Sequence, residues 1–165
     1  MINTHNGVKG KFPRIRIEDY PAIKAHLDQH WDKIFKRADK GETPYNLRNC
    51  AYLEDFYKPK IVWNRIASIK QFAIVDEGIY IQDSMHFIIG NNLEYLCSIL
   101  NSKLIQWLLS LIIGEAAGGN AGNADNIWKL CIPKTNNNDA ISDSDVYSLY
   151  KLTQEEIAYI EKREA

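Results

Sequence analysis

The feature that most constrains the fold is a long run of apolar residues at helical spacing in the second half of the chain. Its apolar positions recur every three or four residues: Leu93, Leu96, Cys97, Leu100, Leu104, Trp107, Leu108 and Leu111. Such a stripe predicts an amphipathic helix that packs on a core. Asn91 and Glu94 have the spacing of a capping box at its start. The last turns are apolar nearly all round, which indicates deep burial or a covering protein surface.

A first helix is predicted between Asp19 and Gly41. Asp19 suits the N-cap, Pro21 suits the first turn, and Gly41 suits the stop. Apolar residues at helical spacing predict one buried face: Ile23, Leu27, Trp31, Ile34, Phe35 and Ala38.

Between residues 46 and 89 the pattern changes to short β-rich runs. The predicted strands are Ile61–Trp63, Phe72–Val75, Ile79–Ile81 and Phe87–Ile89, and the alternation at Arg14–Ile17 and the run Ile127–Ile132 add two short ones. Asp76-Glu77-Gly78 has the composition of a hairpin turn. The fold class predicted from these elements is α+β, with a small, mostly antiparallel sheet flanked by two long helices.

The length and the composition predict one globular domain. A chain of 165 residues with 45% apolar residues can bury a sizeable core. We expect this domain to span residues 1–134. Residues 114–126 are rich in glycine and asparagine and predict a mobile loop. Residues 135–165 would form a polar linker and a C-terminal helix, beginning at Thr153 with Glu156 in a capping box, that packs on or extends the domain.

The net charge of −1 argues against strong free-standing affinity for DNA, because phosphate neutralisation supplies most non-specific binding. The charge is unevenly distributed, however. Residues 1–70 contain 14 Lys and Arg against 8 Asp and Glu, so this half could face phosphate. The three cysteines are widely spaced, which favours reduced thiols in the cytoplasm. The sequence has no apolar segment long enough to span a membrane and no basic-then-apolar leader. We therefore expect a cytoplasmic protein without membrane contacts.

Residues 37–66 are the strongest functional signal, because cationic, amide and aromatic side chains precede a β-rich run that could hold them rigidly. Arginine and lysine bind phosphates, and asparagine and arginine read base edges. The candidate DNA-binding residues in and next to this stretch are Lys36, Arg37, Lys40, Tyr45, Asn46, Arg48, Asn49, Lys58, Lys60 and Arg65.

Several residues of this region also have a structural interpretation. The basic residues of the first helix could form the solvated face of an ordinary amphipathic helix. Asn46 and Asn49 could satisfy the backbone of a turn, and Arg48 could pair with Glu54 or Asp55. Trp63 is more often a core residue than a platform for a base.

The same region resembles a known family. Tyr45-Asn46-Leu47-Arg48, the run from Phe56 to Trp63, Ile99-Leu100-Asn101-Ser102-Lys103-Leu104 and Ile132-Pro133 follow in the order seen in TaqI-like C-terminal specificity domains. The resemblance covers roughly residues 12–134. It implies the target-recognition module of an adenine-N6 DNA methyltransferase or of a fused bacterial type IIG restriction-modification enzyme. Residues 1–9 resemble an internal stretch of such longer enzymes, so we expect the chain to be a C-terminal piece.

Catalytic motifs are missing from the sequence. It has neither the Asn/Asp-Pro-Pro-aromatic tetrapeptide nor the glycine-rich cofactor loop of these methyltransferases, and no Glu-x-Lys or Asp-x-Lys nuclease triplet. We therefore expect no catalytic residue, no cofactor site and no metal site in this chain. S-adenosylmethionine would belong to the methyltransferase domain of the same parent chain. The expected partner is double-stranded DNA, and the alternative is a protein-interaction module of an anti-phage or restriction assembly without base contacts.

Overall fold

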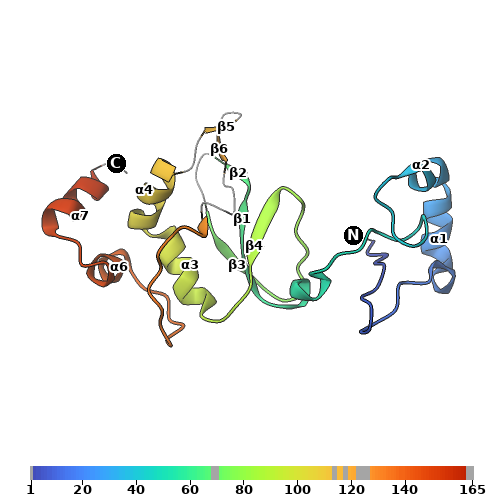
Figure 1. The fold of residues 1–165 in the computed structure, drawn as a ribbon, viewed down its shortest axis with the longest axis horizontal. Helices are drawn as coiled ribbons and strands as arrows, with labels where there is room; N and C mark the ends of the chain where they lie inside the picture. Colours follow the sequence, from blue (N-terminus) through green and yellow to red (C-terminus); the bar gives the residue numbers. More distant parts are fainter. Residues whose placement is uncertain (1, 68–70, 113–114, 117–118, 122–126, 163–165) are drawn as a thin grey trace. The chain divides into compact units, whose positions relative to one another are not determined.

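The computed structural model describes residues 2–67, 71–112, 115–116, 119–121 and 127–162. They belong to two compact units, Met1–Glu54 and Asp55–Ala165, which are described separately below (Figure 1). Helices and an antiparallel sheet confirm the predicted α+β class. The two units meet after Glu54, and residues beyond 134 share a core with the preceding helices.

The first unit contains a 3-10 turn and two short helices. Their bounds are η1 Ile17–Asp19, α1 Pro21–Asp28 and α2 Trp31–Lys36. The prediction of a single long helix here is therefore wrong, because Gln29 and His30 form a turn between α1 and α2. Pro21 does occupy the first turn, but Tyr20 rather than Asp19 is the N-cap. The predicted apolar face is not buried either.

The second unit is built on a three-stranded antiparallel sheet in the order β3-β1-β4. Its strands are β1 Lys60–Asn64, β3 Ala73–Val75 and β4 Met85–Ile88, and Ile61 of β1 is opposite Ile74 and Ile88. The 3-10 helix η2, Leu53–Tyr57, precedes β1. A smaller antiparallel sheet has the order β2-β6-β5, with β2 Ile66–Ala67, β6 Gly119–Ala121 and β5 Glu115–Ala116.

Three predicted strands are absent from the parts of the chain that the structure describes. Residues 79–81, 128–132 and 14–16 are not in strands, and Ile17 begins η1. Gly78 does have a positive φ of 76°, as its turn requires, but residues 79–81 form no strand that could complete a hairpin with β3. The predicted mobile loop at 114–126 lies largely outside the described residues, and β5 and β6 are its described parts.

The long apolar helix is broken into α3, Leu93–Asn101, and α4, Lys103–Ile112, with a bend of 65° between them. Ser102 causes the break, because its backbone is extended and its hydroxyl accepts a hydrogen bond from the Ile105 amide. This contact is an N-cap for α4. The predicted Asn91–Glu94 capping box does not form. The side-chain oxygen of Asn138 instead accepts a hydrogen bond from the Glu94 amide.

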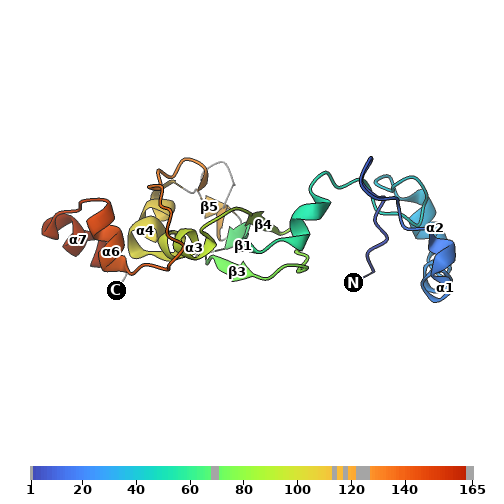
Figure 2. The same cartoon turned by 90° about the horizontal axis from the view of Figure 1, so that it is seen from below.

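Two C-terminal helices complete the second unit: α6, Asp143–Leu149, and α7, Gln154–Glu161. Both begin with a capping box, Ser142 with Asp145 and Thr153 with Glu156, so the predicted terminal helix is confirmed and α6 was missed. Both lie beside α4 (Figure 2).

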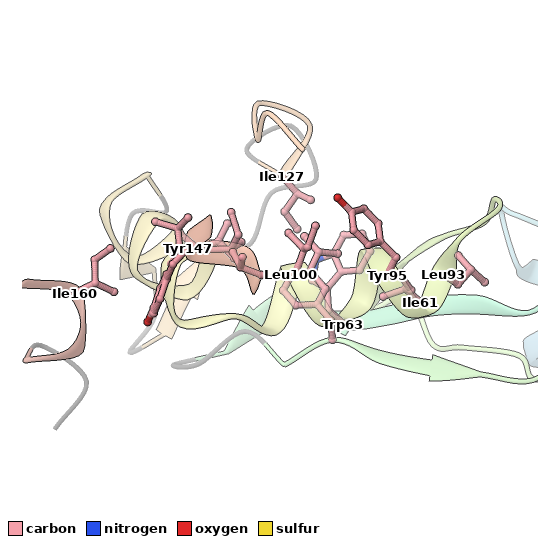
Figure 3. Close-up of a cluster of buried hydrophobic side chains, with 14 residues drawn as sticks. Ile61, Trp63, Leu93, Tyr95, Leu100, Ile127, Tyr147 and Ile160 are labelled. Carbon is pink, nitrogen blue, oxygen red and sulfur yellow. The ribbon is translucent and has the colours of Figure 1, made fainter. Parts of the chain in front are cut away.

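One apolar core joins β1, α3, α4, α6 and α7 (Figure 3). Its least exposed side chains include Ile61, Trp63, Ile99, Leu100, Ile105, Leu109 and Val146. Trp63 is therefore a core residue, as the more frequent behaviour of tryptophan indicated. Among the described residues no single helix is long and apolar enough to cross a membrane, although α3 and α4 together reach the required length and composition as a bent pair.

Candidate nucleic-acid interface

The loop that follows α2 in the first unit is anchored by a buried asparagine. Asn46 is 0% exposed. Its side-chain nitrogen donates to the carbonyl oxygens of Ile15 at 3.0 Å and His5 at 3.3 Å, and its side-chain oxygen accepts from the Thr43 hydroxyl at 2.7 Å. The Asn46 side chain thus joins the loop to two earlier segments of the unit.

Backbone hydrogen bonds hold the same loop from both sides. The Gly41 amide donates to the Asn46 carbonyl at 2.9 Å, and the Leu47 amide donates to the Thr4 carbonyl at 2.9 Å. Arg37 donates from its guanidinium to the Asn46 carbonyl at 2.7 Å. Lys40 and Leu47 form an antiparallel bridge. These hydrogen bonds hold the loop in place at the residues directly before Arg48 in the chain.

Arg48 itself is exposed, and no hydrogen bond or ion pair connects it to a residue that the structure describes. The alternative partners suggested by the sequence are engaged elsewhere: Glu54 pairs with Lys11, and Asp55 pairs with Lys58 at 2.7 Å. The guanidinium of Arg48 is therefore available to an external acceptor. Lys36 at the end of α2 is likewise exposed and, within the described residues, has no charged partner.

Tyr45 takes part in a contact network with α1 and α2. Its hydroxyl donates to Asp28 at 2.6 Å, and its ring centroid lies 5.4 Å from that of Trp31. Lys24 also hydrogen-bonds Asp28 at 2.7 Å. These bonds, first that from Lys24 and then that from Tyr45, lower the pKa of the Asp28 carboxyl, and the bond to Asp28 raises the pKa of Tyr45. The network orients the Tyr45 ring but leaves it partly exposed.

The remaining candidates of the first unit have internal partners. Lys40 donates to the Phe35 carbonyl at 2.9 Å near the end of α2, and its ammonium lies 5.1 Å from the centroid of the Phe35 ring. Arg37 is used by the loop backbone as described above. The side-chain oxygen of Asn49 accepts a hydrogen bond from Asn6, although Asn49 is exposed. Arg37 and Lys40 therefore stabilise the loop and the end of α2.

The three candidates of the second unit are arranged differently from the prediction. Lys60 is 0% exposed, and its ammonium donates to the carbonyl oxygens of Phe56 at 3.1 Å, Ile79 at 3.3 Å and Asp76 at 3.4 Å. Burial lowers the pKa of Lys60.

The sheet face that was expected to present Lys60 to solvent is covered. Val62 on this face is opposite Phe87 of β4, and the Phe56 ring of η2 lies 5.4 Å from the Phe87 ring. Lys58 and Arg65 remain exposed, and each is near an acid, Asp55 and Asp83 respectively.

Two of the predicted DNA contacts are therefore corrected. Asn46 and Lys60 are fully buried, and their polar atoms are hydrogen-bonded inside the protein, so neither can reach a base or phosphate in this conformation. The interpretation of Asn46 as the residue that satisfies a turn is the right one. Arg48, Lys36 and Asn49 are placed where an external partner can contact them.

The sequence analysis missed a group of cations near the N-terminus. Lys9, Lys11 and Arg14 line a groove in the first unit together with Asn49. The signal was present as Lys9-Gly10-Lys11, a glycine turn flanked by lysines between two apolar residues, Val8 and Phe12.

The first unit of this α+β chain holds a loop with an exposed arginine in place by hydrogen bonds of a buried asparagine. The sequence comparison gives its family. Residues 20–119, more than half of the chain, match the family model of the TaqI-like C-terminal specificity domain, and the chain belongs to this family. Membership indicates a DNA-recognition module associated with a methyltransferase. No curated protein matches the chain.

Proposed function

We propose that this chain is a non-catalytic target-recognition module that binds duplex DNA and selects the sequence on which an adenine-N6 methyltransferase of a bacterial restriction-modification system acts. The methyltransferase domain of the same parent chain would bind S-adenosylmethionine and flip the target adenine out of the duplex. A fused nuclease would make the parent a type IIG enzyme. Its place of action would be the cytoplasm.

The difference in exposure between Asn46 and Arg48 supports the proposal most strongly. Asn46 is fully buried and hydrogen-bonded to three segments, whereas Arg48, two residues later, is exposed without a partner among the described residues. A rigid loop that presents an arginine can place two donors against one guanine edge with little loss of entropy on binding. A correct bidentate contact of this kind discriminates between bases by about 1 to 3 kcal/mol.

The first experiment is a selection from random duplexes at low ionic strength, followed by anisotropy titrations with an enriched and a scrambled duplex. We expect Arg48→Ala to weaken binding to the enriched duplex by roughly 5- to 150-fold, with a much smaller effect on the scrambled one. Lys134→Ala in the second unit is the control for loss of one exposed positive charge. Failure of the wild-type chain to enrich any sequence would refute the proposal, as would an unchanged discrimination ratio in Arg48→Ala.

The second experiment tests the absence of catalysis. The purified chain is incubated with S-adenosylmethionine and the enriched duplex, and methylated adenine is measured by mass spectrometry. We expect no turnover. Methylation that remains after repeated purification and scales with the concentration of the chain would contradict the non-catalytic assignment.

One observation favours the alternative, a protein-interaction module. Leu111 and Ile112 at the end of α4 are 58% and 41% exposed, and Trp128 is 69% exposed. Exposed apolar groups of this size are frequent in protein interfaces. We propose that the methyltransferase domain covers them, which is compatible with DNA recognition by the first unit. If the affinity for DNA neither falls with added salt nor depends on Arg48, the protein-interaction module is favoured instead.

A further inference from the structure

An open groove lies in the first unit beside the Arg48 loop. Its volume is about 780 Å³, and its walls are residues 6–14, Glu42 and residues 49–51. This is within the size range of ligand-binding clefts. Asn49 and Cys50 on one wall follow Arg48 directly in the chain, so the groove begins next to the Arg48 backbone.

A tight hairpin forms the other wall. The Val8 amide donates to the Phe12 carbonyl at 3.0 Å, and the Lys11 amide donates to the Val8 carbonyl at 3.0 Å. Gly10 has a φ of 80°, as the third residue of a type II turn requires, and a side chain built on it would meet nothing within 4 Å. The tip of the hairpin therefore opens to solvent, with Lys9 and Lys11 on either side of the glycine.

The base of the hairpin is fixed against the rest of the unit. Gly7 has a φ of 74°, and a side chain at this position would lie 2.6 Å from the Arg14 amide nitrogen. The Ile15 amide donates to the His5 carbonyl at 3.1 Å, and the rings of His5 and Phe12 are in edge contact at 5.2 Å. A close backbone approach and an aromatic contact thus hold the hairpin in place.

The charges on the groove favour an anionic ligand. Lys9, Lys11 and Arg14 line it, against one acid, Glu42. Lys9 is exposed and has no charged partner among the described residues. Arg14 pairs with Glu42 at 3.2 Å, and Lys11 pairs with Glu54. Exposed pairs of this kind contribute at most about 1 kcal/mol, so a phosphate can replace the carboxylate.

We infer that the hairpin 8–12 is a second DNA-contacting element, and that the groove binds the phosphodiester backbone of one strand of the duplex that Arg48 reads. This inference rests on the proposed function. Lys9 contacts a phosphate directly. Lys11 and Arg14 exchange Glu54 and Glu42 for phosphates when DNA binds. The acids keep these cations extended in the free protein and weaken binding to any duplex, since each exchange breaks an internal ion pair.

Alkylation of the cysteines reports on occupancy of the groove within a single protein. Cys50 lines the groove, and Cys131 is exposed in the second unit, where it is the internal reference. The wild-type chain is treated with N-ethylmaleimide with and without a saturating amount of the enriched duplex, and modification of each thiol is followed by mass spectrometry. We expect DNA to slow alkylation of Cys50 several-fold relative to Cys131. No protection of Cys50 while anisotropy shows bound DNA would overturn the inference, and equal protection by inorganic phosphate alone would overturn duplex DNA as the ligand.

Charge variants give an independent readout. We expect Lys9→Ala to weaken binding to the enriched and scrambled duplexes equally, and to reduce the slope of log affinity against log salt by about one. We expect Glu54→Gln to strengthen both, because Lys11 is released. Lys134→Ala and Glu155→Gln in the second unit are the charge-matched controls.

These outcomes separate the two ideas. If the wild-type chain has no sequence preference, the proposed function fails and the inference fails with it. If the chain has a preference that depends on Arg48, but Lys9→Ala and Glu54→Gln behave like their controls, only the inference fails.

Discussion

Replacing Asn46 by alanine tests whether its buried side chain holds the loop that carries Arg48. The substitution removes the hydrogen bonds to the carbonyls of Ile15 and His5 and the one accepted from the Thr43 hydroxyl. Each bond contributes about 1 kcal/mol net, so the loss of the three bonds costs about 3 kcal/mol locally. Because about 1.4 kcal/mol corresponds to a tenfold change in an equilibrium, the loop should open roughly 100 times more often.

Hydrogen exchange followed by mass spectrometry is the appropriate assay, because it resolves the two units separately. The amides of Gly41 and Leu47 are hydrogen-bonded in the wild type and should lose about 100-fold of their protection in Asn46→Ala. Peptides covering β1 in the second unit should be unchanged. Asn49→Ala, an exposed amide in the same loop, is the control. Protection of Gly41 and Leu47 within twofold of the wild type would refute the assignment of Asn46 as the anchor.

Four further substitutions test other parts of the structure. Because burial lowers the pKa of Lys60, the unfolded chain binds the Lys60 proton more tightly than the folded chain does. The free energy of unfolding should therefore rise with pH between the lowered pKa and the ordinary value of 10.5. Urea titrations should show that Lys60→Met removes this rise. Thr153→Ala removes the side-chain N-cap of α7 and should cost about 1 kcal/mol. Hydrogen bonds from the Thr153 backbone and then from its hydroxyl lower the pKa of Glu156, so in the wild type their stabilisation is present above the ordinary pKa of 4.5 and is lost as the pH falls through the lowered value. Hydrogen exchange of α7 should show a weaker pH dependence in the variant, which keeps only the backbone hydrogen bond. Gly7→Ala should abolish the hydrogen-exchange protection of the Val8 and Phe12 amides, because its side chain would meet the Arg14 backbone. Gly10 has a positive φ but open space around it, so Gly10→Ala should cost only the backbone strain. Equal effects of the two substitutions would mean that the close contact at Gly7 is unimportant.

Patterns that depend on neighbouring residues were predictable from the sequence. The strands around Val62 and Phe87 and the capping box of Thr153 and Glu156 are encoded in a few adjacent positions, and the structure contains them. The break at Ser102 was also encoded locally, because a serine three residues before Ile105 can cap a new helix. The continuous apolar stripe around it concealed this signal.

The errors concern burial, which depends on distant parts of the chain. Lys60 reads as a cation on an exposed strand face, and only η2 and the segment after β3 enclose its ammonium with three carbonyl groups. Asn46 reads as a base-reading amide, but its partners include the His5 carbonyl, 41 residues earlier in the sequence. Trp31 and Phe35 read as core positions, yet they are 39% and 53% exposed. No local pattern distinguishes these cases.

The interior shared by α4, α6 and α7 limits how specificity can be exchanged between related enzymes. The family match stops at residue 119, but Val146, Tyr147 and Ile160 fill the same interior as Leu100 and Leu104. A chimera joined at residue 119 would combine this chain up to residue 119 with α6 and α7 of another enzyme. The apolar surfaces of the two parts would not have evolved to pack together. Engineers who wish to transplant the target preference of this chain should therefore carry everything through α7.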